Sequence, residues 1–303
     1  MPGIITTGNH PKALWPGVKS WWGRTYSEHE KEWPKLFDQT TSTQAWEEYV
    51  ELTGFGLTPV KRENGPFVTD SETQGTVARI TNVAYMLGFI VTHEELMDNL
   101  YEIVSKRRAK ALAFSMSQTE EIVHANMYNN GFTAGAYAIG DGAAWFSASH
   151  PCLTGNQSNT STGADLSEGA LEDLLTQIML ATNSRGLKIN LMPKSVAVHP
   201  SKWWDSQRII KSALQSDSNL NNINVIAATR AIPEGVILNH YFATPGAFFI
   251  RTNAPESTIH QDREGAKVDM DNDFQTMNAF TRGYQRYGLG VGDWRGCFAN
   301  PGP

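Results

Sequence analysis

The spacing of hydrophobic residues along the 303-residue chain changes near residue 92. Residues 74–92 are rich in β-branched and aromatic residues and contain no proline, which predicts a strand. Residues 93–130 contain neither proline nor glycine, and Thr92 followed by two early glutamates provides an N-cap and an acidic first turn. Gly131 then stands where a helix commonly ends. The pattern predicts a strand that leads into one helix of about 50 Å, long enough to cross the whole molecule.

The predicted helix has two different sides, and a kink is expected near residues 98–101. Its apolar side is formed at three- and four-residue spacing by Leu96, Leu100, Ile103, Val104, Leu112, Met116, Val123 and Met127. The opposite side carries a basic patch of Lys106, Arg107, Arg108 and Lys110. This patch is either a solvated helix face or a surface that meets acidic neighbours or nucleic acid, and the sequence leaves both interpretations open.

The first 44 residues are too irregular to form a core of their own. They contain several glycines, prolines at positions 2, 11 and 16, and four tryptophans, namely Trp15, Trp21, Trp22 and Trp33. So many aromatic side chains need an apolar surface to lie on. We expect an arm that packs either on its own globule or on a neighbouring copy of the chain.

Residues 44–76 predict a long β-hairpin. An alternating pattern begins at Trp46, and Asn64-Gly65-Pro66 is a strong turn signal at the centre. With about ten residues per arm at roughly 3.3 Å each, the hairpin would reach about 30 Å. Its tip is polar and charged, with Lys61, Arg62, Glu63 and Asn64. Because an isolated hairpin is only marginally stable, we expect it to be either floppy or supported by another subunit.

The rest of the chain mixes helices and strands. Glycines and a tight turn at 140–142 predict a short hairpin over 131–151, and Asp165 or Ser167 caps a predicted helix that ends near Gly186. Further predictions are a helix from Ser201 and strands over 192–200, 222–229, 235–241, 247–253 and 258–298. We expect the last of these to pair with residues 74–92. The class is α+β, with no strict βαβ repeat and no glycine-rich phosphate loop.

Composition and charge exclude several classes of function. The chain is 40% hydrophobic and 18% charged, as in an ordinary folded protein with a sizeable core. A net charge of −6 lacks the overall basic character of a dedicated DNA-binding protein, so any contact with nucleic acid must be local. Cys152 and Cys297 form neither a disulfide framework nor a metal spacing. We expect a cytosolic protein without a signal peptide, a membrane span, a metal or a cofactor.

Three patterns carry potential chemistry, and all are weak. Asp269, Asp271 and Asp273 begin like a calcium loop, but Phe274 and Phe280 replace its glycine and its bidentate glutamate. His150 and Cys152, with Asp165, resemble a nucleophilic site, yet Pro151 fixes a turn between them and no oxyanion element is evident. Three carboxylate pairs would act in hydrolysis only if a cleft brought them together, namely Glu47-Glu48, Glu94-Glu95 and Glu120-Glu121. We therefore expect no enzyme.

The order of the parts resembles a known family. An arm is followed by a hairpin with GPFVTDSETQG, the strand ITNVAYMLGFIVTHEEL, a long helix ending in MYNNGF, the segment DGAAWFSASHP, then DLSEGALEDLLTQI, RGLKINLMPKSVAVHP and the late YGLGVGDWRG. Over nearly the whole chain this order is similar to tailed-bacteriophage major capsid proteins of the Hong Kong 97 type, most of all to the branch of Mu-like major head subunits. The individual motifs are soft, and their joint order is the specific feature.

The resemblance implies a division of the chain into parts. These are an N-arm (1–45), an extended E-loop (46–82), a peripheral domain with a long spine helix (83–130 and 258–285) and an axial domain (131–257), to which 286–303 would return. In such shells the E-loop lies over a neighbouring subunit, and axial domains meet in pentamers and hexamers. The implied interface residues are Lys61, Arg62, Glu63, Asn64 and Phe67 at the E-loop tip, Trp15, Trp21 and Trp22 on the N-arm, and the basic patch.

The resemblance also implies partners and a place of action. An icosahedral head would enclose double-stranded DNA by weak non-specific contact, with a portal protein at one vertex and a decoration or cement protein as a further partner. The early prolines and the absence of heptads argue against a fused scaffolding segment, so a separate scaffolding protein is expected. The protein would assemble in the host bacterial cytoplasm and reside in the virion. No motif positions Lys61 and Asn300 for a covalent cross-link.

Three alternatives remain open from the sequence. An encapsulin-like compartment would have the same fold but enclose cargo enzymes. A tail-tube or baseplate protein would form rings or tubes. A hydrolase using His150 or paired carboxylates would act as a small oligomer.

Overall fold

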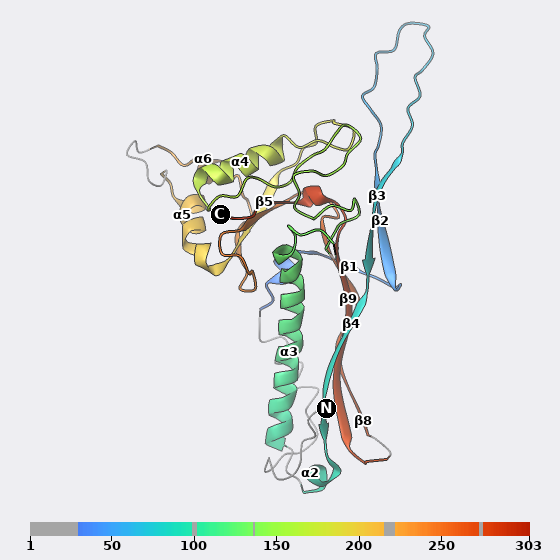
Figure 1. The fold of residues 1–303 in the computed structure, drawn as a ribbon, viewed down its shortest axis with the longest axis vertical. Helices are drawn as coiled ribbons and strands as arrows, with labels where there is room; N and C mark the ends of the chain where they lie inside the picture. The colour runs from blue at the N-terminus through green and yellow to red at the C-terminus, as the bar shows by residue number, and fades with distance from the viewer. Residues whose placement is uncertain (1–29, 99–101, 136, 215–221, 273–274) are drawn as a thin grey trace.

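The computed structural model describes residues 30–98, 102–135, 137–214, 222–272 and 275–303. Figure 1 shows three parts: a long layer of helix and sheet, a wider block beside its upper end, and a hairpin that projects away from both. The structure is mixed α and β, as the sequence predicts.

The long layer is a four-stranded sheet with one helix along it. Its strand order is β1 (Asp38–Thr41), β8 (Thr258–Asn272), β9 (Ala279–Val291) and β4 (Val83–Val91), and we call it the long-strand sheet. Helix α3 (Glu102–Asn129) runs beside the sheet, and a short helix α2 (His93–Met97) precedes it. Leu112 and Met116 of α3 are buried in a small core with Val268. The predicted apolar side of the helix therefore faces this sheet.

The strand predicted over residues 74–92 is divided at Asn82. Its first part, β3 (Gln74–Thr81), pairs with β2 (Trp46–Leu52), whereas β4 pairs antiparallel with β9. The buried Asn82 Nδ2 donates to Ser42 Oγ (2.9 Å) and to the Gln44 carbonyl (2.8 Å), which holds the crossing point. The predicted pairing with the C-terminal strands is confirmed for β4. It is wrong for β3, which pairs with β2 instead.

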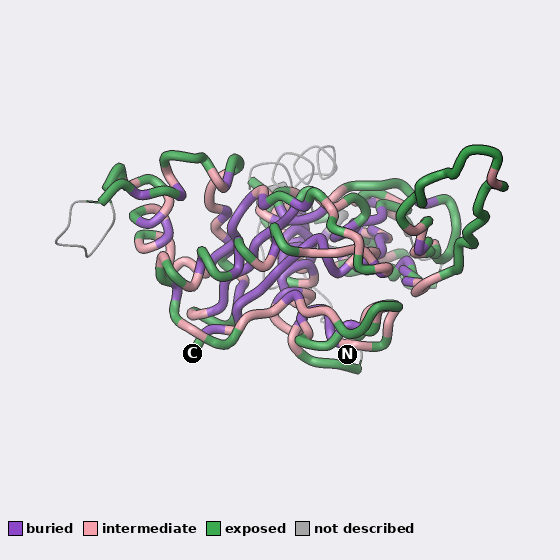
Figure 2. Tube along the Cα trace, turned by 90° about the horizontal axis from the view of Figure 1, so that it is seen from above, coloured by how far each residue is buried: buried purple, intermediate pink, exposed green. Residues whose placement is uncertain are grey.

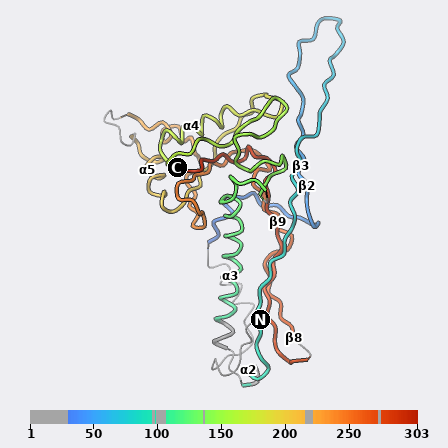
Figure 3. Tube along the Cα trace, in the orientation of Figure 1, coloured from blue at the N-terminus to red at the C-terminus, as the bar shows by residue number. Residues whose placement is uncertain are grey.

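The hairpin of β2 and β3 continues beyond its paired strands as a loop of residues 53–73. We call residues 46–81 the projecting hairpin. A hydrogen bond from the Gly65 amide to the Arg62 carbonyl (3.0 Å) closes the tip, and Asn64 has the left-handed φ of 56° that this turn requires. Figure 3 shows the loop extending away from the rest of the chain.

The wider block is built on a second sheet. The order of this short-strand sheet is β10 (Cys297–Asn300), β7 (Phe248–Thr252), β5 (Pro193–Val198) and β6 (Gly235–Leu238). Helices α4 (Glu168–Met179), α5 (Trp203–Lys211) and α6 (Val225–Thr229) surround it. Figure 2 shows that buried residues concentrate here, whereas the projecting loop is exposed. The main hydrophobic core thus lies in this block and reaches the end of α3 through Tyr128 and Trp145.

Several local predictions are confirmed and several are wrong. Ser167 caps α4 by accepting from the Ala170 amide, although the helix ends at Met179 and not at Gly186. Within residues 222–229, predicted as a strand, Val225–Thr229 form α6 because the Asn224 side chain accepts from the Ala227 amide and caps the helix. The hairpin predicted over 131–151 is reduced to a turn with one isolated bridge between Ala138 and Ala144.

Helix α3 ends near Gly131 as predicted, but the glycine is there for a different reason. Gly131 does not have a positive φ, so it is no left-handed helix cap. A Cβ at Gly131 would lie 2.7 Å from the ring of Phe146. The glycine is needed because the chain passes close to this buried aromatic ring.

Candidate subunit-interface surfaces

The loop of the projecting hairpin exposes apolar side chains that its own chain does not cover. They include Leu57, exposed by 82%, and Val60, exposed by 95%, and the complete set on the loop is Phe55, Leu57, Val60, Phe67 and Val68. Leu52, the last residue of β2, is also exposed. The predicted tip residues Lys61, Arg62, Glu63 and Asn64 are also exposed. Contiguous apolar surface on a protruding loop is typical of a protein interaction site.

The base of the projecting hairpin is tied to the short-strand block by ionic contacts. On the outgoing arm, Glu51 Oε1 lies 3.3 Å from Arg295 Nη1 and accepts from the Ser184 hydroxyl. On the returning arm, Asp70 Oδ2 lies 2.8 Å from Arg185 Nη1. We call Glu51, Asp70, Arg185 and Arg295 the hairpin clasp. It fixes the direction in which the exposed loop leaves the body.

A tight turn supports the same hairpin from below. A Cβ at Gly140 would lie 2.7 Å from the Val77 carbonyl carbon and 2.8 Å from the Ala78 amide nitrogen. The turn therefore rests directly on the backbone of β3. No larger residue fits without moving one of the two segments.

The root of the N-terminal arm is pinned to α3. Trp33 is buried and stacks on His124, with ring centroids 4.3 Å apart, and lies 4.2 Å from the ring of His260. The Glu121 carboxylate accepts from the backbone amides of Glu32 (2.8 Å) and Trp33 (3.2 Å). The root thus packs on its own chain. Trp15, Trp21 and Trp22 lie outside the described residues.

Burial shifts the pKa values of the groups around this root in opposite directions. Desolvation raises the pKa of Glu121 to about 7. Desolvation lowers the pKa of His124 to about 3 and that of His260 to about 4. His124 Nε2 and His260 Nδ1 are 3.0 Å apart, which suits two neutral rings joined by one N–H···N hydrogen bond.

The predicted basic patch on α3 is not one uniform surface. Arg107 is exposed, and Lys110 is half-buried. Arg108 turns inward, where its Nη1 lies 3.3 Å from Oε1 of the fully buried Glu95, and burial lowers the pKa of its guanidinium. The side chain of Lys106 lies outside the description. The patch therefore presents Arg107 and part of Lys110 to solvent, while Arg108 joins α3 to α2.

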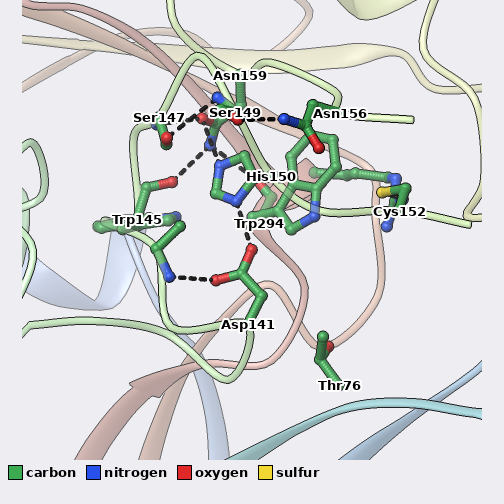
Figure 4. A network of polar contacts seen from close by, with 12 residues as sticks. Thr76, Asp141, Trp145, Ser147, Ser149, His150, Cys152, Asn156, Asn159 and Trp294 are labelled. Atoms are coloured by element: carbon green, nitrogen blue, oxygen red, sulfur yellow. Dashed lines mark hydrogen bonds and ion pairs between the residues drawn. The ribbon is translucent and has the colours of Figure 1, made fainter.

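The structure does not support the hydrolytic alternative. His150 is buried, its Nδ1 lies 2.6 Å from Asp141 Oδ2, and its Nε2 lies 3.0 Å from Asn159 Oδ1 (Figure 4). Since the Asn159 amide nitrogen donates to backbone carbonyls such as that of Trp145 (2.8 Å), the oxygen facing His150 is an acceptor. Both ring nitrogens thus have hydrogen-bond partners within the chain. Neither is available as a base toward a substrate.

The other residues of the hydrolytic patterns are dispersed. Burial raises the pKa of the Cys152 thiol, the opposite of what a nucleophile needs, and Asp165 pairs with Lys202 at 2.7 Å. Glu48 pairs with Arg79, Glu95 with Arg108 and Glu120 with Lys31. The carboxylates therefore hold elements together and line no common cleft.

Metal binding and membrane insertion find no support in the described part of the chain. Asp269 and Asp271 lie on strand β8, and Asp273 is outside the description. Within the described ranges no three acidic, histidine or cysteine side chains gather as metal ligands. None of the described helices is both long and apolar enough to cross a bilayer.

Comparison with known proteins identifies the family. A family model described as phage capsid protein matches residues 79–300, well over half of the chain, and the chain belongs to this family. It is therefore a structural protein of a phage capsid and not an enzyme. No curated protein sequence matches the chain.

Solved structures show the same fold at low sequence identity. The Mycobacterium phage Patience structure is 11% identical with a TM-score of 0.58, covering 100% of this chain and 93% of its own. The capsid of a native GTA particle is 10% identical with a TM-score of 0.58, covering 99% and 95%. A virus-like particle from Pyrococcus furiosus is 11% identical with a TM-score of 0.51, covering 93% and 97%. The fold is of the Hong Kong 97 type, as the sequence resemblance predicts.

Proposed function

We propose that copies of this chain assemble as pentamers and hexamers into an icosahedral phage head that encloses double-stranded DNA. In this assignment the projecting hairpin is the E-loop, the long-strand sheet with α3 is the peripheral domain, and the short-strand block is the axial domain. The observation that carries the proposal is the set of exposed apolar side chains on the loop of the projecting hairpin.

Burial of the exposed apolar side chains of the loop favours contact with another copy of the same chain. Burying one large apolar side chain contributes roughly 1.5–3 kcal/mol, so the five on the loop represent a sizeable unused driving force. Identical subunits offer the same receiving surface at every position of a shell. Each contact can be modest because many contacts act together.

The proposal includes the other interface residues and partners. The tip residues Lys61, Arg62, Glu63, Asn64 and Phe67 contact the neighbour, and the N-arm tryptophans Trp15, Trp21 and Trp22 pack on a neighbouring copy. A separate scaffolding protein, a portal protein at one vertex and a decoration or cement protein complete the head. The Mu-like branch, assembly in the host cytoplasm and residence in the virion belong to the same proposal.

Charge is consistent with a shell that holds its genome weakly. The chain has a net charge of −6, and among the described residues of the basic patch Arg108 turns inward to pair with Glu95. A wall of this kind would contact packaged DNA only locally and without sequence preference.

A second candidate is a compartment that encloses protein cargo. The fold likeness to a virus-like particle from Pyrococcus furiosus, with a TM-score of 0.51, keeps this candidate because a shell of this fold need not enclose a genome. Particles that copurify with DNA and need a portal would favour the phage head. Particles filled with one host enzyme would favour the compartment.

The experiment that tests the proposal is electron microscopy of the purified chain, with and without a candidate scaffolding protein. We expect capsomer rings or closed shells from the wild-type chain, and neither after deletion of residues 61–67. Arg79→Ala, a change on the paired base of the same hairpin, is the matched control and should still assemble. A wild-type chain that remains a monomer under every condition would contradict the proposal.

A further inference from the structure

Two exposed helix faces on the short-strand block are complementary in their order of charged and apolar residues. Helix α4 buries Leu171, Leu174, Leu175 and Ile178. On the opposite side, one turn from its start, it exposes Glu172 and Asp173, and seven residues later it exposes Met179 and Leu180. We call these four residues the α4 stripe. It is acidic at one end and apolar at the other.

Helix α5 has the reverse arrangement. It buries Ser206 and Ile209 and exposes Trp204, Arg208 and Lys211, which are spaced by four and three residues and so share one side of the helix. Trp204 is exposed by 73%. Arg208 also pairs with Asp205 on its own helix. We call Trp204, Arg208 and Lys211 the α5 stripe, which is aromatic at its start and basic at its end.

The two stripes match in length and in the order of their ends. The α4 stripe spans nine residues and the α5 stripe eight, or about 12 Å and about 10 Å along a helix. In an antiparallel arrangement, Lys211 faces Glu172 while Trp204 faces Met179 and Leu180. Among the described residues, Glu172, Asp173 and Lys211 have no ion-pair partner within the chain.

The positions of the helices favour a contact between two copies. They approach each other at their beginnings, where Lys202 pairs with Asp165, and then diverge, α4 along the upper border of the block and α5 down its left side in Figure 1. Helix α4 packs nearest to β10 and α5 nearest to β6, the two opposite edges of the short-strand sheet. One copy cannot bring its own stripes together, but a neighbour rotated about a common axis can.

We propose that the α4 stripe of one copy packs antiparallel on the α5 stripe of the next copy in each capsomer. The contact is heterologous, with different surfaces on its two sides, and such contacts close into rings when the rotation between copies allows it. The inference rests on the proposed function, because it names the partner surface within the pentamers and hexamers. Electrostatic attraction between the basic and acidic ends sets the register, and the apolar ends supply buried area.

Charge reversal with rescue tests the proposal. Lys211→Glu and Glu172→Lys should each reduce the yield of rings and shells by at least about tenfold, because each places like charges in contact. The double variant Lys211→Glu with Glu172→Lys should recover most of the yield. Lys188→Glu, an equal charge change at an exposed position of the same block outside both stripes, should assemble like the wild type. Thermal unfolding of unassembled subunits verifies that every variant folds.

The outcomes separate this inference from the proposed function. Normal assembly of either single variant would overturn the stripe contact while leaving the capsid role intact. Two defective single variants without rescue would also overturn it, because α5 would then contact an accessory protein or another surface. A wild-type chain that forms no rings would count against the proposed function itself.

Discussion

Opposing pKa shifts at the root of the N-terminal arm determine how acid affects the folded subunit. The pKa of Glu121 is raised to about 7 from 4.5, so the folded chain binds a proton there that the unfolded chain releases as the pH rises above 4.5. Its contribution to stability is present at low pH and is lost as the pH rises through 7. The pKa values of His124 and His260 are lowered from 6.5 to about 3 and about 4, so both oppose folding as the pH falls below 6.5.

The directions of these pKa shifts predict that the stability of the wild-type chain and that of a Glu121→Gln variant depend differently on pH. Between pH 4.5 and 6.5, the proton that Glu121 takes up on folding offsets one of the two that the histidines release. Glu121→Gln removes that offset, so the free energy of unfolding should fall more steeply toward acid, by about 1.4 kcal/mol per pH unit relative to the wild type. Denaturant titrations of unassembled subunits across this range measure the slopes. Equal slopes for the wild type and Glu121→Gln would contradict the raised pKa of Glu121.

The buried hydrogen bond between His150 and Asp141 is a structural link between segments, and its loss has a predictable cost. Asp141→Asn replaces the carboxylate that the buried His150 ring contacts by a neutral amide, which should lower the free energy of unfolding by about 1–3 kcal/mol. Asn156→Ala, in the same loop but exposed, should change it by less than about 0.5 kcal/mol. Chemical denaturation at neutral pH compares them, and equal effects would show that the pair is not a link.

At the scale of elements, the turn at Gly140 supports the projecting hairpin through backbone contact. Gly140→Ala should destabilise the subunit by about 1–3 kcal/mol, because the added Cβ meets backbone atoms of β3 that cannot rotate away. Gly169→Ala in α4 meets nothing within 4 Å and should be neutral or stabilising by up to about 1 kcal/mol. Thermal unfolding of the two variants gives the comparison, and a tolerated Gly140→Ala would refute the close contact.

The hairpin clasp is expected to restrain the loop before assembly. Arg185→Ala removes the ion pair with Asp70, so amide hydrogen exchange over residues 53–73 should accelerate several-fold while β2 and β3 remain protected. Arg79→Ala removes an ion pair with Glu48 that lies within the hairpin, and exchange in the loop should stay at the wild-type rate. Identical exchange in both variants would mean that the clasp does not hold the loop.

Helices, strands and turns were predictable where a local sequence signal, such as a turn, a cap or an alternating pattern, agrees with the tertiary contacts. The Asn64-Gly65 turn, the Ser167 cap and the alternation through β8 and β9 are all visible in the sequence. The division at Asn82 was not, because it depends on hydrogen bonds to Ser42 and Gln44, some forty residues away. The helix α6 was missed because the cap by Asn224 outweighs the β propensity of Val225 and Ile226.

At the scale of the whole molecule, the order of parts revealed the fold, whereas the contacts that organise the surfaces were hidden. The exposure of Lys61 and its neighbours at the hairpin tip was predictable because a charged turn sequence indicates a solvent-exposed tip. The clasp between Glu51 and Arg295 was not, since 244 positions separate the two residues. The same holds for Arg108, whose inward turn toward Glu95 depends on how α2 folds back on α3.

The central claim is that the exposed apolar loop holds identical subunits together in a shell. The most direct measurement is electron microscopy and sedimentation of a variant in which Leu57, Val60 and Phe67 are replaced by serine, beside Arg79→Ala as control. The account predicts folded subunits with unchanged thermal unfolding that form no closed shells, while the control and the wild type assemble. Shells of normal size and yield from the triple variant would contradict it.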